Sequence, residues 1–296
     1  MNIENLIAQI TDSIQQRLGS KCNVSTTKVT KNNGIVLNGL VFQEEGTHIC
    51  PTIYLDDFLE SLALGVSMET VIQKILELYQ KSDIQENIDV SNLAKFQNVK
   101  SRIIFQLINT ERNASLLREI PSVPFLDFSI IFKILIGSSA ENTATGTIGY
   151  SLMEIWNVSV EELHEAAKVN TPVLMPCELK SMREILEGYN DIPFIDDCCK
   201  MFVLSNQQRV NGCGSILYPY VLEKFAENIC SDLFILPSSV HDVILVPFNE
   251  APKRQNAEAL AEIVRSVNKR ELSQEDFLSD HVYHYSRKTK SITIAK

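Results

Sequence analysis

A set of side chains capable of nucleophilic hydrolysis is crowded into one short stretch of the chain, at Ser238, Ser239, His241 and Asp242. A hydrolase uses such residues as a serine nucleophile, a histidine base and an orienting acid. However, no G-x-S-x-G motif surrounds either serine, and residues this close in sequence seldom meet in that geometry. Pro237 followed by two serines is typical of a turn between strands. The sequence therefore favours a structural corner, with a hydrolase site at the same residues as the alternative.

A second group of potential ligands lies near the C-terminus, where Asp280, His281 and His284 form a D-H-x-x-H pattern. Histidines and carboxylates are common metal ligands. The neighbouring residues Val282, Tyr283 and Tyr285 favour a strand. Residues three apart on a strand face opposite sides, so His281 and His284 are expected to diverge rather than to share a metal ion.

The glycine-rich segment 211–215 precedes a predicted helix and carries Cys213. A helix N-terminus lowers the pKa of a thiol, which makes Cys213 a candidate reactive cysteine. The segment lacks the Lys-Ser/Thr ending of a phosphate-binding loop and the spacing of a dinucleotide fingerprint, so we expect a tight turn and no cofactor. Asn206, which ends the preceding predicted strand, is a further residue that an enzyme site could recruit.

The first part of the chain is predicted to form a small α+β module. Apolar residues at helical spacing indicate a helix over 2–18. Two β-prone runs, 22–30 and 35–43, flank Asn33-Gly34, which is the strongest short hairpin signal. A third strand over 48–54 and helices over 56–64 and 67–80 complete a helix, a three-stranded meander and two helices. The polar stretch 81–92 is the predicted linker, so residues 1–92 and 93–296 are the two expected modules.

The larger module is predicted to be mixed α+β with mostly antiparallel strands, since the elements do not alternate in a regular βαβ rhythm. Strands are expected over 101–108, 125–136 and 145–151. A capping box at Ser159 and Glu162 opens a helix that should stop before Pro172. Further helices are expected over 178–187, 216–228 and 256–268, the last with Ile263 and Val267 inward. The helix over 216–228 lies between two strands and would allow one parallel crossover. A hairpin of 281–287 with 291–294 ends the chain.

Charge and composition narrow the function classes. The 296 residues carry a net charge of −10, which opposes binding to the phosphates of nucleic acid. No apolar stretch is long enough to span a bilayer, and the N-terminus lacks the pattern of a secretory signal, so we expect no membrane association. Seven cysteines without a C-x-x-C pair fit reduced thiols and a cytoplasmic location.

Several segments together resemble a known family. They include KNNGIVLNGLVF, PTIYLDDF, WNVSVEELHEAAKVNTP, NGCGSILYPYVLEKFAE, ILPSSVHDVILVP and LSDHVYHYSR. This set is similar to a family of bacterial proteins, frequent in gut Clostridia, that is labelled only as a domain of unknown function. The resemblance covers nearly the whole chain, which implies one unit of 296 residues and a bacterial cytoplasmic protein. It implies no activity and no catalytic residue.

The leading hypothesis is therefore a soluble, non-enzymatic protein that binds another protein or a small ligand. Its acidic surface would suit a basic partner. The alternative is a hydrolase or metal-dependent enzyme whose site joins the His241 corner to Asn206, Cys213 or the His281 and His284 pair.

Overall fold

The structure is a computed structural model that describes residues 2–44, 50–81, 93–138, 143–187, 201–249 and 257–295. The chain divides into two compact units, Met1–Ala94 and Lys95–Lys296. Of the predicted linker over 81–92, Lys81 ends a helix and residues 82–92 lie outside the described residues. Both units combine helices with antiparallel sheets, so the predicted α+β class is confirmed. None of the described helices has the length and apolar character needed to cross a membrane.

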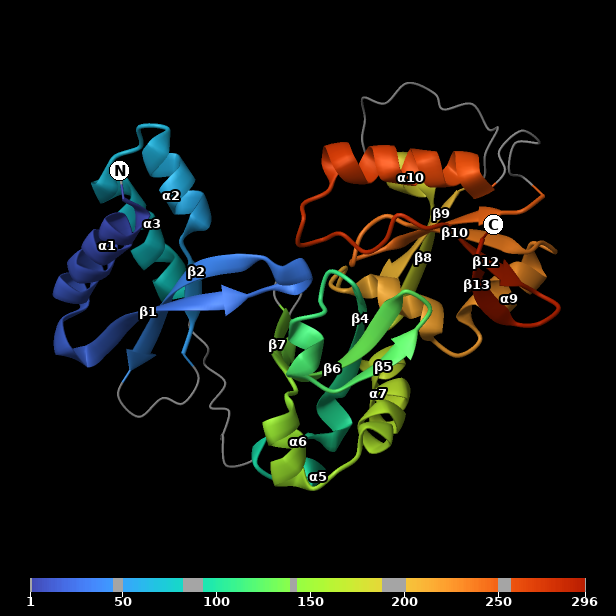
Figure 1. Cartoon of the computed structure of the whole chain (residues 1–296), viewed down its shortest axis with the longest axis horizontal. Coiled ribbons are helices and arrows are strands. Elements are labelled where there is room, and N and C mark those ends of the chain that lie inside the picture. The colour runs from blue at the N-terminus through green and yellow to red at the C-terminus, as the bar shows by residue number, and fades with distance from the viewer. Residues whose placement is uncertain are drawn as a thin grey trace. The chain divides into compact units, whose positions relative to one another are not determined.

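The first unit packs three helices against a three-stranded sheet of order β1-β2-β3 (Figure 1). Its elements are α1 (Ile3–Leu18), β1 (Cys22–Thr30), β2 (Val36–Glu44), β3 (Thr52–Tyr54), α2 (Asp56–Ala63) and α3 (Met68–Lys81). The predicted hairpin is confirmed, with Asn33 and Gly34 at φ values of 59° and 72° in the turn. The buried core joins Ile10 and Ile14 of α1 to Leu40 and Phe42 of β2.

The second unit contains two sheets. The four-stranded sheet is built from β4 (Ile103–Asn109), β5 (Ser122–Phe125), β6 (Phe128–Ser138) and β7 (Thr143–Thr147). Strand β6 is central, because β4 pairs along one edge while β5 and β7 pair with successive parts of it. The helices α5 (Phe96–Val99), α6 (Tyr150–Trp156) and α7 (Val160–Leu174) belong to the same part of the chain.

The six-stranded sheet has the order β13-β12-β10-β11-β9-β8, with antiparallel pairing throughout its described strands. Its elements are β8 (Cys177–Ser181), α8 (Met182–Glu187), β9 (Phe202–Asn206), α9 (Val221–Asn228), β10 (Leu233–Pro237), β11 (Val243–Pro247), α10 (Ala257–Glu271), β12 (Tyr283–Ser286) and β13 (Ser291–Ile294). Helix α10 covers one face (Figure 1), packing on Phe234 and Val246. Helix α9 packs Phe225 edge-on against Phe202, whose side chain points to the opposite face of the sheet. Helices therefore cover both faces of this sheet.

Several predicted elements differ from those observed. Residues 125–136 do not form one strand, because Leu126 at φ 56° turns the chain between β5 and β6. Residues 178–181 form β8, and the helix predicted there begins only at Met182, where Ser181 and Glu184 make a capping box. Strands β9 and β10, which flank α9, run in the same direction, but β11 lies between them and no parallel pair forms in this described sheet.

Two helices also differ in detail. The capping box at Ser159 is confirmed, but α7 continues through Pro172 to Leu174. A proline in the last turn removes few hydrogen bonds, and the Thr171 hydroxyl donates to the Ala167 carbonyl at 2.6 Å. In α10, Ile263 and Val267 are about half exposed, at 46% and 47%, and were wrongly expected to point inward.

Candidate functional site

The corner between β10 and β11 holds His241 through both of its ring nitrogens. The backbone N–H of Asn211 donates to Nδ1 at 3.2 Å. The proton must therefore be on Nε2, which lies 3.1 Å from Oδ1 of Asp276. The Ser239 hydroxyl accepts from the His241 backbone N–H at 2.9 Å and donates to Asp242 at 3.3 Å. Among these described residues, neither serine hydroxyl bonds to the imidazole, so the corner lacks the nucleophile–base contact of a hydrolase.

Asn206 and Cys213 also serve the local structure. The Asn206 side chain donates to the Val210 carbonyl at 2.8 Å and accepts from the Val210 N–H at 3.1 Å, which closes the loop after β9. Cys213 is fully buried in a short 3-10 helix, Gly212–Leu217. Burial raises the pKa of the Cys213 thiol, and the nearby charge of Asp242 raises it further. The expected lowering of this pKa was wrong, because burial outweighs the helix N-terminus.

We expect Cys213 to resist alkylation in the folded protein, because only a thiolate that reaches solvent reacts rapidly. Iodoacetamide at pH 8, followed by mass mapping, should modify the exposed Cys230 and leave Cys213 unmodified until urea is added. Equal labelling of the two cysteines without urea would contradict the buried placement.

The C-terminal histidines diverge, each toward its own aspartate. His284 Nε2 lies 3.3 Å from Asp232, and its ring packs edge-on against Phe234 and Phe248. His281 Nδ1 instead lies 3.0 Å from Oδ2 of Asp127. Within the described part of the chain, no group of three or more histidine, cysteine or acidic residues is arranged to hold a metal ion.

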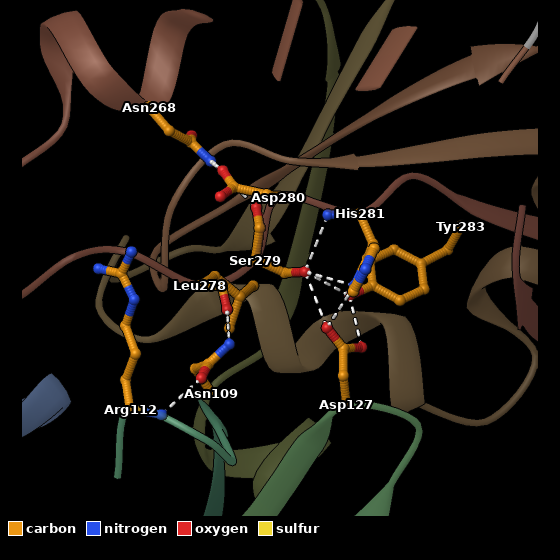
Figure 2. Close-up of polar contacts among 9 residues, drawn as sticks. All are labelled: Asn109, Arg112, Asp127, Asn268, Leu278, Ser279, Asp280, His281 and Tyr283. Atoms are coloured by element: carbon orange, nitrogen blue, oxygen red, sulfur yellow. Dashed lines mark hydrogen bonds and ion pairs between the residues drawn. The ribbon is translucent and has the colours of Figure 1, made fainter. Parts of the chain in front are cut away.

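A polar cluster of the second unit surrounds Asp127, in the turn between β5 and β6 (Figure 2). Its carboxylate accepts from the Tyr283 hydroxyl at 2.7 Å, from the Ser279 hydroxyl at 2.8 Å and from His281 Nδ1 at 3.0 Å. These three donors alternate along the extended segment before and into β12, so they share one side of it. The cluster thus fastens the β5–β6 turn to the C-terminal segment.

Two asparagines fasten the same segment through its backbone (Figure 2). Asn109 donates to the Leu278 carbonyl at 3.0 Å, and Asn268 of α10 donates to the Ser279 carbonyl at 3.0 Å and to Asp280 at 2.9 Å. Both asparagine side chains belong to buried residues. This cluster was not predicted from the sequence, although the Ser-x-His-x-Tyr pattern at 279–283 indicates three polar side chains on one side of an extended segment.

The electrostatics of the cluster support a structural role. Burial alone would raise the pKa of Asp127, but the hydrogen bonds from Tyr283, His281 and Ser279 outweigh it and hold this pKa below its ordinary value. Because Nδ1 of His281 faces a carboxylate, a neutral imidazole keeps its lone pair on Nε2. The His281 side chain is 57% exposed, so solvent reaches the ring.

A different kind of site lies in the first unit, along the outer edge of β1. Of the described strands, only β2 pairs with β1. Gln15 of α1 covers the start of that edge: its side-chain amide donates to the Cys22 carbonyl at 2.9 Å and accepts from the Val24 N–H at 2.8 Å. A glutamine side chain therefore replaces one peptide group of a missing neighbouring strand.

Beyond Gln15, none of the described residues pairs with the edge. Backbone groups in an antiparallel ladder alternate between the two neighbours of a strand. Since Val24 points its N–H away from β2, Thr26 and Lys28 must point theirs away as well. No hydrogen bond within the described residues reaches these outward groups of Thr26 and Lys28.

An open groove accompanies this free edge. Its β-sheet wall is formed by residues 24–28 of β1 with Asn38 and Gly39 of β2. Its helical wall is the first half of α1, where Ile3, Ile7 and Ala8 supply apolar surface and Glu4 and Asp12 supply acidic side chains. A free strand edge beside an apolar helix wall is the arrangement that accepts an added β-strand.

The comparisons with known proteins concern the chain as a whole. The model of the family DUF5688, described as a family of unknown function, matches residues 3–287, which span both units. Neither the curated proteins nor the solved structures gave a match to the chain. Because the match covers almost the full length, the chain belongs to the family of unknown function DUF5688.

Proposed function

We propose that this protein binds an extended segment of another polypeptide, which adds as a strand to the free edge of β1. One observation carries the proposal: Gln15 pairs with the edge at Cys22 and Val24 and leaves it open at Thr26 and Lys28. Added strands gain affinity from main-chain hydrogen bonds and specificity from pockets for alternate side chains. Residues 24–28 of this edge also line an open groove.

The proposed occupant is a short segment of a different protein, because a second copy paired about Thr26 conflicts with Gln15. A twofold axis at Thr26 would place residues 22 and 24 of one β1 opposite residues 30 and 28 of the other. Gln15 already occupies the edge at Cys22 and Val24. A peptide that pairs only with the stretch from Thr26 to Thr30 avoids this conflict.

The hydrolase alternative has less support, because both ring nitrogens of His241 are engaged by Asn211 and Asp276. The binding proposal includes a bacterial cytoplasmic setting. That part rests on the similarity of the sequence segments to bacterial proteins and on the free thiols of Cys22, Cys50, Cys177, Cys213 and Cys230.

Peptides selected from a phage-displayed random library on the full-length protein provide the test. Fluorescence anisotropy with a selected synthetic peptide should show that Thr26→Pro weakens binding about 10-fold to 100-fold. Proline removes the outward N–H and leaves a peptide carbonyl without its donor, at a cost of roughly 1–3 kcal/mol. Proline is tolerated on edge strands, so circular dichroism should show a folded variant.

Thr26→Ala is the matched control, because it keeps the N–H and should bind within about threefold of the wild type. Methylating alternate backbone nitrogens of the peptide tests the same ladder on the unmodified protein, and only one of the two alternating sets should abolish binding. Equal binding by wild type and Thr26→Pro, or a dimer that Thr26→Pro converts to a monomer, would overturn the proposal.

A further inference from the structure

The side chains of the groove wall indicate the kind of peptide segment that would bind there. This inference rests on the proposed function. Helix α1 presents two neighbouring rows of side chains to the groove at four-residue spacing. One row is Ile3, Ile7 and Thr11, and the other is Glu4, Ala8 and Asp12. The first row is apolar at its start, and the second places a small residue between two acids.

The start of the apolar row is accessible. Ile3 is 56% exposed at the beginning of α1, although it lies on the same helical stripe as Ile10, which is buried in the core, and Ile7 is partly buried. When an apolar ligand side chain covers this isoleucine, apolar surface is removed from water and the complex is stabilised. Alternate side chains of an added strand lie about 6.6 Å apart on one face, so two consecutive ones reach along this row.

The acidic row sets the charge of the ligand. Asp12 lies one helical turn before Gln15, beside the closed end of the β1 edge. Glu4 and Asp12 are the two acids among the lining residues and Lys28 is the one cation, so the lining carries a net negative charge. The overall charge of −10 favours approach of a basic ligand as well.

We infer that the bound segment is an extended peptide with apolar residues at alternate positions and a lysine or arginine at the end that faces Asp12. Gln15 determines which end that is, because its side-chain amide blocks any further pairing toward Cys22. The basic residue therefore belongs to the end of the peptide that reaches Val24, whose N–H Gln15 already holds. The apolar positions follow along Thr26 and Lys28.

The test compares peptides selected from the random library on the wild type and on Asp12→Lys. Wild-type selection should enrich lysine or arginine at one terminal position, and Asp12→Lys should replace that preference with aspartate or glutamate. With a synthetic basic peptide, Asp12→Asn should weaken binding about fivefold, and this difference should shrink in 1 M salt. Ile3→Ser should weaken binding about fivefold through lost apolar contact.

The matched control is Asp57→Asn, an acid in the first turn of α2 that does not line the groove. It should bind the basic peptide like the wild type. Peptides that bind in a Thr26-dependent manner but show no basic preference, and that ignore Asp12→Asn, would overturn this inference and leave the proposed function standing. The absence of any Thr26-dependent peptide would overturn both.

Discussion

Replacing Gly212 with alanine is expected to destabilise the second unit by about 3 kcal/mol, the upper end of the usual cost of overpacking. A Cβ at this position would lie 2.2 Å from the Ser205 hydroxyl, 2.5 Å from the His241 carbonyl oxygen and 2.6 Å from the Asn206 nitrogen. Two of these three atoms are backbone. They cannot rotate away, so either β9 or the His241 corner must shift.

The corner and β9 are held in place by several hydrogen bonds. The Ser205 hydroxyl donates to the His241 carbonyl at 2.7 Å, and the Cys213 N–H donates to the Val240 carbonyl at 3.2 Å. The shift forced by the added methyl group would break or lengthen these bonds. The sole tryptophan of the chain, Trp156, is buried in the second unit. Its fluorescence during urea unfolding therefore measures the stability of that unit alone.

Gly146→Ala is the matched control. Gly146 lies in β7 of the same unit, and a Cβ there would meet only Ile136 Cδ1, at an ordinary 3.6 Å. Its free energy of unfolding should differ from that of the wild type by less than about 1 kcal/mol. If Gly212→Ala were as stable as Gly146→Ala, the close packing of the corner against β9 would be wrong.

Local signals in the sequence predicted most of the fold, because they depend on neighbouring residues. Asn33 and Gly34 accept positive φ, so the hairpin of β1 and β2 is confirmed, and Ser159 with Glu162 starts α7 as expected. The break between β5 and β6 was not predictable in this way. Leucine rarely adopts positive φ, and nothing near Leu126 in sequence indicates that the chain turns there.

The candidate sites depend on distant residues and were harder to predict. His281 was singled out from the sequence, but its partner Asp127 is 154 positions away and lay inside a predicted strand. The open edge of β1 depends on how far Gln15 reaches from α1. No sequence pattern fixes that reach, because it follows from the angle at which the helix packs on the sheet.

Asp127→Asn is expected to destabilise the second unit by about 2–3 kcal/mol at pH 7, a typical value for charge-assisted hydrogen bonds. The carboxylate accepts from Tyr283, Ser279 and His281, and an amide has only one oxygen for these donors. The Trp156 signal in urea again gives the free energy of unfolding. The matched control is Asp280→Asn, at the residue after Ser279. It should lower the free energy of unfolding by less than about 1 kcal/mol, because the hydrogen bond from Asn268 can be kept.

Tyr283→Phe separates the contribution of the tyrosine hydroxyl from that of the charge. It removes the bonds to Asp127 and to Ser279 while leaving the buried ring in place. If the cluster acts as one unit, the double variant with Asp127→Asn should be more stable than the sum of the single effects predicts, by at least about 1 kcal/mol. Additive effects would mean that the hydroxyl and the carboxylate contribute independently.

The acid dependence of stability tests the charge itself. The pKa of Asp127 is lower in the folded protein than the value of about 3.9 expected for an unfolded aspartate. A carboxyl with a lowered folded pKa binds fewer protons in the folded state, so its contribution is complete above the unfolded pKa and is lost as the pH falls through the folded pKa. The stability difference between wild type and Asp127→Asn should therefore be constant from pH 7 to about pH 5 and should shrink below about pH 4. A difference that stays constant down to pH 3 would show that the ionised carboxylate is not the group that Tyr283, Ser279 and His281 stabilise.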